Sequence, residues 1–191
     1  MMRIITGSAR GVRLASLEGE ATRPTAERVK EAIFSSIQFD IEGRAVLDLF
    51  AGSGQLGLEA LSRGASSAMF VDASADAMAI VKTNAKKTGF FDRSRFLISD
   101  YRSYLRKASG RDGYHLIFLD PPYAQNLVPD ALQRILDAKL AKPGCLIVCE
   151  SNTPDVFAGN EALAAEFEAV KTARYGIAHV AILRYVGERE S

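Results

Sequence analysis

Short apolar runs recur along most of the chain, and each is five residues long. Runs this short and continuous are typical of strands in a parallel sheet that is covered on both faces, because neither side of such a strand meets water. The pattern predicts strands at residues 45–49, 68–72, 95–99, 115–119 and 145–149.

Between these runs, apolar residues return at helical spacing. The pattern predicts helices at residues 55–63, 74–88, 101–108 and 128–140. Ser74 is suited to cap the second helix, Gly89 follows its end, and Pro129 lies near the first turn of the last helix. This alternation of strand and helix indicates βαβ units with right-handed crossovers.

The two ends of the chain follow other patterns. Residues 2–17 are expected to form a hairpin, followed by a helix over 26–38 that Thr25 caps. Near the C-terminus we expect a short helix at 160–166 and an antiparallel hairpin over 167–186 at the sheet edge. The predicted fold class is therefore α/β: a doubly wound, mainly parallel, seven-stranded Rossmann-like sheet with a C-terminal antiparallel hairpin and a short N-terminal hairpin-plus-helix extension.

The composition is that of an ordinary soluble globular protein, with 48% apolar and 25% charged residues. A chain of 191 residues is expected to form one domain. No apolar run could span a bilayer and the first residues lack the apolar segment of a signal peptide, so we expect a cytoplasmic protein with no membrane partner. Cys145 and Cys149 lie in one apolar run and are expected to be buried thiols, and no residue cluster predicts a metal site.

The net charge is only +1, but the charges are distributed unevenly. Residues 1–30 contain six lysines and arginines against three acids, and residues 82–111 contain nine against two. Two basic segments on a nearly neutral chain are consistent either with a binding surface for a polyanion or with ordinary solvated faces. Charge alone leaves both interpretations open.

A glycine-rich turn follows the first expected strand. The stretch DLFAGSGQLG, residues 48–57, contains the pattern G-x-G-x-x-G, and glycine lets the backbone approach a ligand closely. Asp72 ends the next strand, where a carboxylate can accept hydrogen bonds from a ribose diol. NAD and S-adenosylmethionine both fit, and a purely structural turn would use the same glycines. Asp48 favours S-adenosylmethionine, because a carboxylate repels a pyrophosphate and attracts an ammonium or sulfonium group.

The fourth expected strand leads into the corner Asp120-Pro121-Pro122-Tyr123. Each proline fixes its own φ and restricts the residue before it, so the corner is stiff and Asp120 projects at a fixed angle. Prolines lack an N–H group, so the carbonyl groups of Asp120 and Pro121 can accept hydrogen bonds from a ligand. A tight turn capped by Asp120 is the structural alternative, and the position after a buried strand favours a functional role.

These motifs together resemble those of a known enzyme class. DLFAGSG, an acid ending the second strand and DPPY after the fourth resemble the class I S-adenosylmethionine-dependent amino-methyltransferases. MRIITGSARGVRL, TRPTAERVKEAIFSSI, VLDLFAGSGQLGLEALSRGA and RYG are similar to the bacterial 16S rRNA guanine-N2 methyltransferases, the RsmD-like family. The resemblance implies one methyltransferase domain over residues 1–191, with an extension at 1–40 that contacts RNA or cofactor and a catalytic core at 41–191. Asp72 departs from the glutamate that is frequent in this family, which affects only the detail of the ribose contact.

The resemblance implies methyl transfer from S-adenosylmethionine to the exocyclic N2 of a guanine in 16S rRNA. Asp120 and the Pro121 carbonyl would accept hydrogen bonds from the amine, Pro122 would stiffen the corner, and Tyr123 would stack on the extruded base. No strong general base is needed, because the proton can leave once the nitrogen is cationic. The residues expected to bind the cofactor are Asp48, Phe50, Ala51, Gly52, Ser53, Gly54, Asp72, Asp100 and Arg23.

Some of these residues have a second interpretation. Asp100 could bind the adenine amino group or only cap a helix. Arg23 could contact the carboxylate of the cofactor, an RNA phosphate or neither. The candidates for RNA phosphates are Arg10, Arg13 and Lys30. The residues expected to be packing residues are Tyr101, Tyr104 and Tyr175.

Three other functions fit parts of the pattern. A DNA adenine-N6 methyltransferase shares DPPY, but this chain leaves little room for a target-recognition domain. A non-catalytic RNA-binding paralogue would show a broken motif, and an NAD dehydrogenase would need a catalytic dyad at a strand end. The expected partner is 16S rRNA in an assembled or partly assembled small ribosomal subunit, and the expected state is a monomer. The sequence leaves open the exact nucleotide and the choice between naked RNA and ribonucleoprotein.

Overall fold

Seven strands form one sheet in the computed structural model, which describes residues 2–17, 24–108, 113–122 and 125–187. The strands are β1 (Ala45–Asp48), β2 (Ser67–Asp72), β3 (Ser94–Ile98), β4 (Tyr114–Leu119), β5 (Ala141–Ser151), β6 (Phe167–Tyr175) and β7 (Ala178–Tyr185). Their order is β3-β2-β1-β4-β5-β7-β6. The first five pair in parallel, whereas β7 runs antiparallel to β5 and β6. The predicted sheet and its C-terminal antiparallel hairpin are confirmed.

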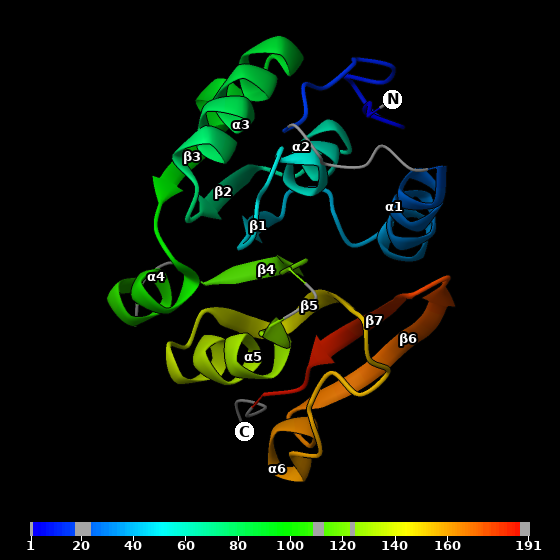
Figure 1. The fold of residues 1–191 in the computed structure, drawn as a ribbon, viewed down its shortest axis with the longest axis vertical. Helices are drawn as coiled ribbons and strands as arrows, with labels where there is room; N and C mark the ends of the chain where they lie inside the picture. The colour runs from blue at the N-terminus through cyan, green and yellow to red at the C-terminus, as the bar shows by residue number, and fades with distance from the viewer. Residues whose placement is uncertain (1, 18–23, 109–112, 123–124, 188–191) are drawn as a thin grey trace.

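Helices cover both faces of the sheet (Figure 1). One layer consists of α1 (Pro24–Ile37), α2 (Gln55–Ser62) and α3 (Ala75–Thr88), and the other contains α4 (Tyr101–Ala108) and α5 (Val128–Asp137). A short 3-10 turn, η1 (Phe91–Arg93), precedes β3, and α6 (Glu161–Ala164) precedes β6. Each layer buries its own apolar cluster against the sheet. Among the described residues, no helix combines the length and apolar character needed to cross a membrane.

The predicted ends of α3 are confirmed, and those of three other helices are corrected. Ser74 caps α3 by accepting a hydrogen bond from the Ala77 N–H group. The first helix begins at Pro24, so Thr25 lies within its first turn and is not its N-cap. The fifth helix ends at Asp137, because Lys139 adopts a positive φ and its neighbour Leu140 bonds back to Ile135. The predicted helix at 160–166 is only four residues long.

The strand β3 is more exposed than its apolar sequence predicts. Leu97 is 39% exposed and Ile98 is 54% exposed, so the expectation of burial on both faces is wrong for this strand. The reason is its position at the edge of the sheet, where α3 packs against β3 but α4 packs under β2. An apolar run therefore predicts a strand without determining how many layers cover it.

The N-terminal segment, residues 2–17, folds back as the predicted hairpin. A single antiparallel bridge joins Arg3 to Arg13. The bend packs closely on the end of α2, and a Cβ atom at Gly7 would lie 1.9 Å from the Ser62 carbonyl oxygen. Only glycine permits this approach, so the extension is fitted to the core rather than appended to it.

The buried carboxylate of Glu59 fixes the N-terminal segment to α2. Glu59 is 0% exposed, and its two oxygens accept hydrogen bonds from the N–H groups of Ile5 at 2.8 Å and Thr6 at 3.0 Å. The Arg63 Nε donates to the same carboxylate at 2.9 Å, and the Lys30 Nζ lies 3.7 Å away. Two cations and two backbone donors thus compensate one buried charge.

Lys30 belongs to this buried cluster, so the prediction that it contacts an RNA phosphate is wrong. Its side chain is buried, and its Nζ donates a hydrogen bond to the Arg3 carbonyl at 2.6 Å. Burial lowers the pKa of Lys30, and the charge of Glu59 opposes that shift. Arg10 and Arg13, by contrast, are exposed.

We expect the substitution Glu59→Gln to destabilise the protein strongly. It leaves Lys30 buried without its counter-charge, which typically costs about 3–5 kcal/mol and should lower Tm by roughly 10 °C. Thermal unfolding followed by circular dichroism measures this shift. The matched control is Glu31→Gln, at an exposed position of α1. A Glu59→Gln shift as small as that of the control would contradict the role of the buried cluster.

Candidate active site

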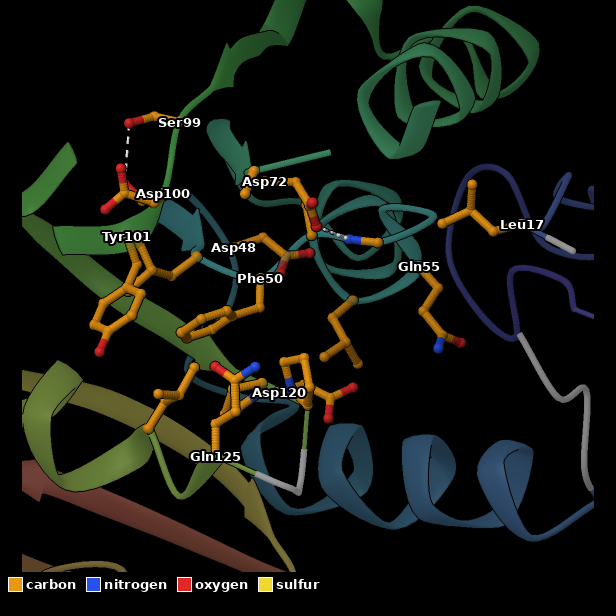
Figure 2. A pocket seen from close by; sticks show the side chains of 18 residues that line it. Leu17, Asp48, Phe50, Gln55, Asp72, Ser99, Asp100, Tyr101, Asp120 and Gln125 are labelled. Atoms are coloured by element: carbon orange, nitrogen blue, oxygen red, sulfur yellow. Dashed lines mark hydrogen bonds between the residues drawn. The ribbon is translucent and has the colours of Figure 1, made fainter. Parts of the chain in front are cut away.

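A cavity of about 980 Å³ opens at the carboxyl ends of the central strands (Figure 2). Its walls come from the turn after β1, the ends of β2 and β3, the corner after β4 and the end of the N-terminal segment. Ligands of doubly wound sheets bind at this edge, where the loops from neighbouring strands converge. The cavity therefore lies where the sequence predicts a binding site.

Two carboxylates accept hydrogen bonds from the backbone around the glycine-rich turn. The Asp48 Oδ2 accepts a hydrogen bond from the Gly57 N–H at 3.0 Å, and the Asp72 Oδ2 accepts one from the Gly52 N–H at 2.9 Å. Gly57 is also required for packing, because a Cβ atom there would lie 2.4 Å from the Phe70 ring. These contacts fix the backbone between the end of β1 and the first turn of α2.

Asp48 is a buried acid on the cavity wall. The pKa of Asp48 is raised to about 7, mainly by burial and in smaller part by the nearby charge of Asp72, while the hydrogen bond from the Gly57 N–H opposes the shift. A carboxyl group poised in this range changes its charge near neutral pH. A cationic ligand in the cavity would favour its ionised form.

An aromatic pair forms the floor beside the ends of β1 and β3. The rings of Phe50 and Tyr101 have centroids 5.2 Å apart, and both residues line the cavity. Tyr101 packs as predicted, and its hydroxyl donates to Asp130 at 2.6 Å. Asp100 caps α4 through the Ser103 N–H at 2.9 Å, a bond that lowers the pKa of Asp100, and it also borders the cavity.

The proline corner closes the opposite side of the cavity. Asp120, Pro121 and Pro122 line it, and in the view of Figure 2 Asp72 lies above and Asp120 below. Pro121 is buried while Pro122 is exposed. The fourth residue of the motif, Tyr123, lies outside the described residues, as does Arg23.

The structure thus brings most of the predicted residues to one cavity. They are Asp48, Phe50, Ala51, Gly52, Asp72, Asp100, Asp120, Pro121 and Pro122. Ser53 and Gly54 do not line it. Ser53 is buried against the N-terminal segment, where its hydroxyl donates to the sulfur of Met2, and Gly54 is the N-cap of α2 with φ 79°.

Several residues of the site belong to no motif that the sequence revealed. Gln125 and Leu17 line the cavity although they lie outside the quoted motifs, and Gln55 lines it from a variable position inside the glycine-rich motif. The side chain of Asn84 on α3 connects two walls: its Nδ2 donates to the carbonyls of Ala15 and Ser53, both at 2.9 Å, and its Oδ1 accepts from the Ala15 N–H at 2.8 Å. Asn84 is 0% exposed, and a polar residue on the apolar face of a helix is the sequence signal that could have predicted this role.

Both cysteines are confirmed as buried thiols. Cys145 and Cys149 lie in the core of β5, and burial raises the pKa of each thiol. Such groups stay protonated and take no part in the cavity.

Comparison with known proteins identifies relatives that match most of the chain. The model of the family described as conserved hypothetical protein 95 matches residues 2–184. YlbH of Bacillus subtilis (strain 168) is 40% identical over 150 residues, which cover 78% of this chain and 82% of that protein. Ribosomal RNA small subunit methyltransferase D of Haemophilus influenzae is 34% identical over 151 residues, 78% of each chain.

A solved structure agrees with this assignment. The Escherichia coli protein yhhF superimposes with a TM-score of 0.83 and 28% identity, and the match covers 96% of this chain and 97% of that one. The match to the family model extends from the N-terminal segment into β7. The chain therefore belongs to the conserved hypothetical protein 95 family, the family of ribosomal RNA small subunit methyltransferase D.

Proposed function

We propose that this protein methylates the exocyclic N2 amine of a guanine in the 16S rRNA of the small ribosomal subunit. The observation that carries the proposal is that the glycine-rich turn and the Asp120-Pro121-Pro122 corner open onto the same cavity. A methyl donor bound at the glycine-rich turn and an amine bound at the proline corner would therefore lie in the same cavity. The relatives named ribosomal RNA small subunit methyltransferase D support ribosomal RNA as the substrate.

S-adenosylmethionine is the methyl donor. When bound, it supplies an electrophilic methyl group on a sulfonium sulfur. The residues that line the cavity match the different parts of this molecule. Asp48 lies beside the glycine-rich turn, where it suits a cationic group, and Asp72 offers acceptors for the ribose hydroxyls. Asp100 lies next to the aromatic pair, where it suits the adenine amino group. An anionic pyrophosphate would meet three carboxylates there, which disfavours a dinucleotide.

The corner after β4 acts on the amine of the substrate. The lone pair of a guanine N2 is delocalised into the ring, so the amine must be held while its nitrogen becomes tetrahedral. The Asp120 carboxylate and the Pro121 carbonyl accept hydrogen bonds from the N–H groups, and these bonds strengthen as the nitrogen becomes positive. Tyr123 stacks on the base after it leaves the helix or when a loop presents it.

The enzyme works as a monomer in the cytoplasm, on assembled or partly assembled subunits. Arg10 and Arg13 are exposed on the N-terminal segment, and we assign them to RNA phosphates. Arg23 remains a candidate for the donor carboxylate or for an RNA phosphate, with a surface position that contacts neither as the alternative. The segment at 1–40 thus serves as the extension that meets the substrate, beside the catalytic core at 41–191.

The substrate is tested by supplying labelled S-adenosylmethionine with small subunits, naked 16S rRNA or duplex DNA. We expect label in the small-subunit or rRNA reaction, at the N2 of one guanine when the product is digested and mapped. Label in duplex DNA, at adenine N6, would contradict the proposal and support the related DNA chemistry.

The substitution Asp120→Ala removes an acceptor that faces the amine. We expect the rate of transfer to fall roughly 10²–10³-fold, as for loss of one preorganised hydrogen bond in a transition state. Affinity for S-adenosylmethionine, measured by calorimetry, should stay within about tenfold, or roughly 1.4 kcal/mol. The control Asp40→Ala, at an exposed position, should change neither quantity. Wild-type turnover by Asp120→Ala would refute its assigned role.

The raised pKa of Asp48, about 7, makes donor binding depend on pH. Below pH 7 the donor-free protein holds a proton on Asp48, and a bound cation favours the ionised form, so binding releases that proton. We expect release of about one proton at pH 6, less at pH 8, and affinity that rises over this interval. Calorimetry in buffers of different ionisation enthalpy counts the protons. In Asp48→Asn the release should disappear, and an unchanged release would exclude Asp48 as its source.

A further inference from the structure

A strip of aromatic, apolar and cationic side chains lies along the edge strand, outside the cavity. Its members are Phe91 of η1, Phe96 and Ile98 of β3, and Lys82 and Lys86 of α3, which we call the edge track. Phe91 is 38% exposed and Ile98 is 54% exposed, and both lysines are exposed. Exposed apolar side chains that are grouped together and bordered by polar groups can mark an interaction site.

The side chains of the edge track contact one another. The Lys86 Nζ lies 5.2 Å from the Phe91 ring centroid, and the Lys82 Nζ lies 5.9 Å from that of Phe96. The two rings are 5.1 Å apart. Among the described residues, neither lysine forms an ion pair with an acid. The ammonium groups therefore lie over the rings, and no acid among the described residues neutralises their charge.

The surroundings of the edge track are strongly basic. Between residues 82 and 96 the chain contains five cationic residues and one acid, Asp92. The exposed cations in this interval are Lys82, Lys86, Lys87, Arg93 and Arg95. A surface of this kind attracts a polyanion, and its rings add a π-face that a purely electrostatic patch lacks.

The edge track leads to the mouth of the cavity. Ile98 is followed directly by Ser99 and Asp100, which line the cavity wall. The strand β3 extends about 16 Å away from that point, with α3 beside it (Figure 1). A polymer with one residue in the cavity could continue along the strand.

We propose that the edge track binds an unpaired segment of the RNA substrate next to the target nucleotide. Phosphates lie at Lys82 and Lys86, and a base stacks on the Phe91 ring. The proposal rests on the proposed function, because it takes the occupant of the cavity to be part of an RNA. Unpaired RNA fits better than a duplex, since only splayed bases offer a face to an aromatic side chain.

The test is binding of the full chain to a fluorescein-labelled single-stranded RNA oligonucleotide, followed by anisotropy over a range of KCl concentrations. For the double variant Lys82→Gln/Lys86→Gln, the slope of log K against log salt should decrease in magnitude by about 1.4, or roughly 0.7 for each phosphate that the protein no longer neutralises. For Phe91→Ala, binding should weaken roughly tenfold with the slope unchanged. Affinity for S-adenosylmethionine should stay at the wild-type value in both variants.

The matched control is Lys171→Gln/Arg174→Gln, which removes two exposed cations from β6 at the opposite edge of the sheet. Its salt slope should equal that of the wild type. The proposal is overturned if the edge-track variants keep the wild-type slope, if the slope of the control decreases as much as theirs, or if the wild-type chain does not bind the RNA. Binding that depends on the edge track without any methyl transfer to rRNA would instead defeat the proposed function and leave the edge track standing.

Discussion

The site depends on one constraint: two carboxylates from adjacent strands grip the backbone of the turn between β1 and α2. Asp48 binds the Gly57 N–H and Asp72 binds the Gly52 N–H, so the turn is held at both ends. Because Gly57 has no Cβ atom, α2 can also pack closely against the Phe70 ring. The same acids line the cavity, so the groups that shape the turn also place two carboxyl groups on the cavity wall.

A second set of buried polar groups joins the N-terminal segment to this frame. Glu59 holds the N–H groups of Ile5 and Thr6, and Asn84 holds Ala15 while it also binds the carbonyl of Ser53 in the turn. Leu17, two residues after Ala15, lines the cavity. The segment is therefore part of the cavity wall, and buried hydrogen bonds fix it to the glycine-rich turn.

The sequence was informative wherever local chemistry decides the structure. The apolar runs predicted the five parallel strands, the glycine spacing predicted the turn, and the prolines after β4 predicted a corner at the cavity. The sequence predictions were wrong where contacts with residues far away in the chain decide the structure. Lys30 reads as a surface cation, yet Glu59 draws it into the core, and β3 reads as a buried strand, yet its place in the sheet order exposes Ile98. Such outcomes depend on contacts between residues far apart in the chain, which periodicity does not encode.

The central claim is that the donor and the Asp120-Pro121 corner meet across one cavity, and a crystal structure of the protein with S-adenosylmethionine tests it most directly. The account predicts that the amino-acid end of the donor lies beside Asp48, that the ribose hydroxyls lie at Asp72, and that the methyl carbon points toward Asp120 and Pro121. Density showing the methyl group directed away from that corner, or the donor bound elsewhere on the protein, would contradict it.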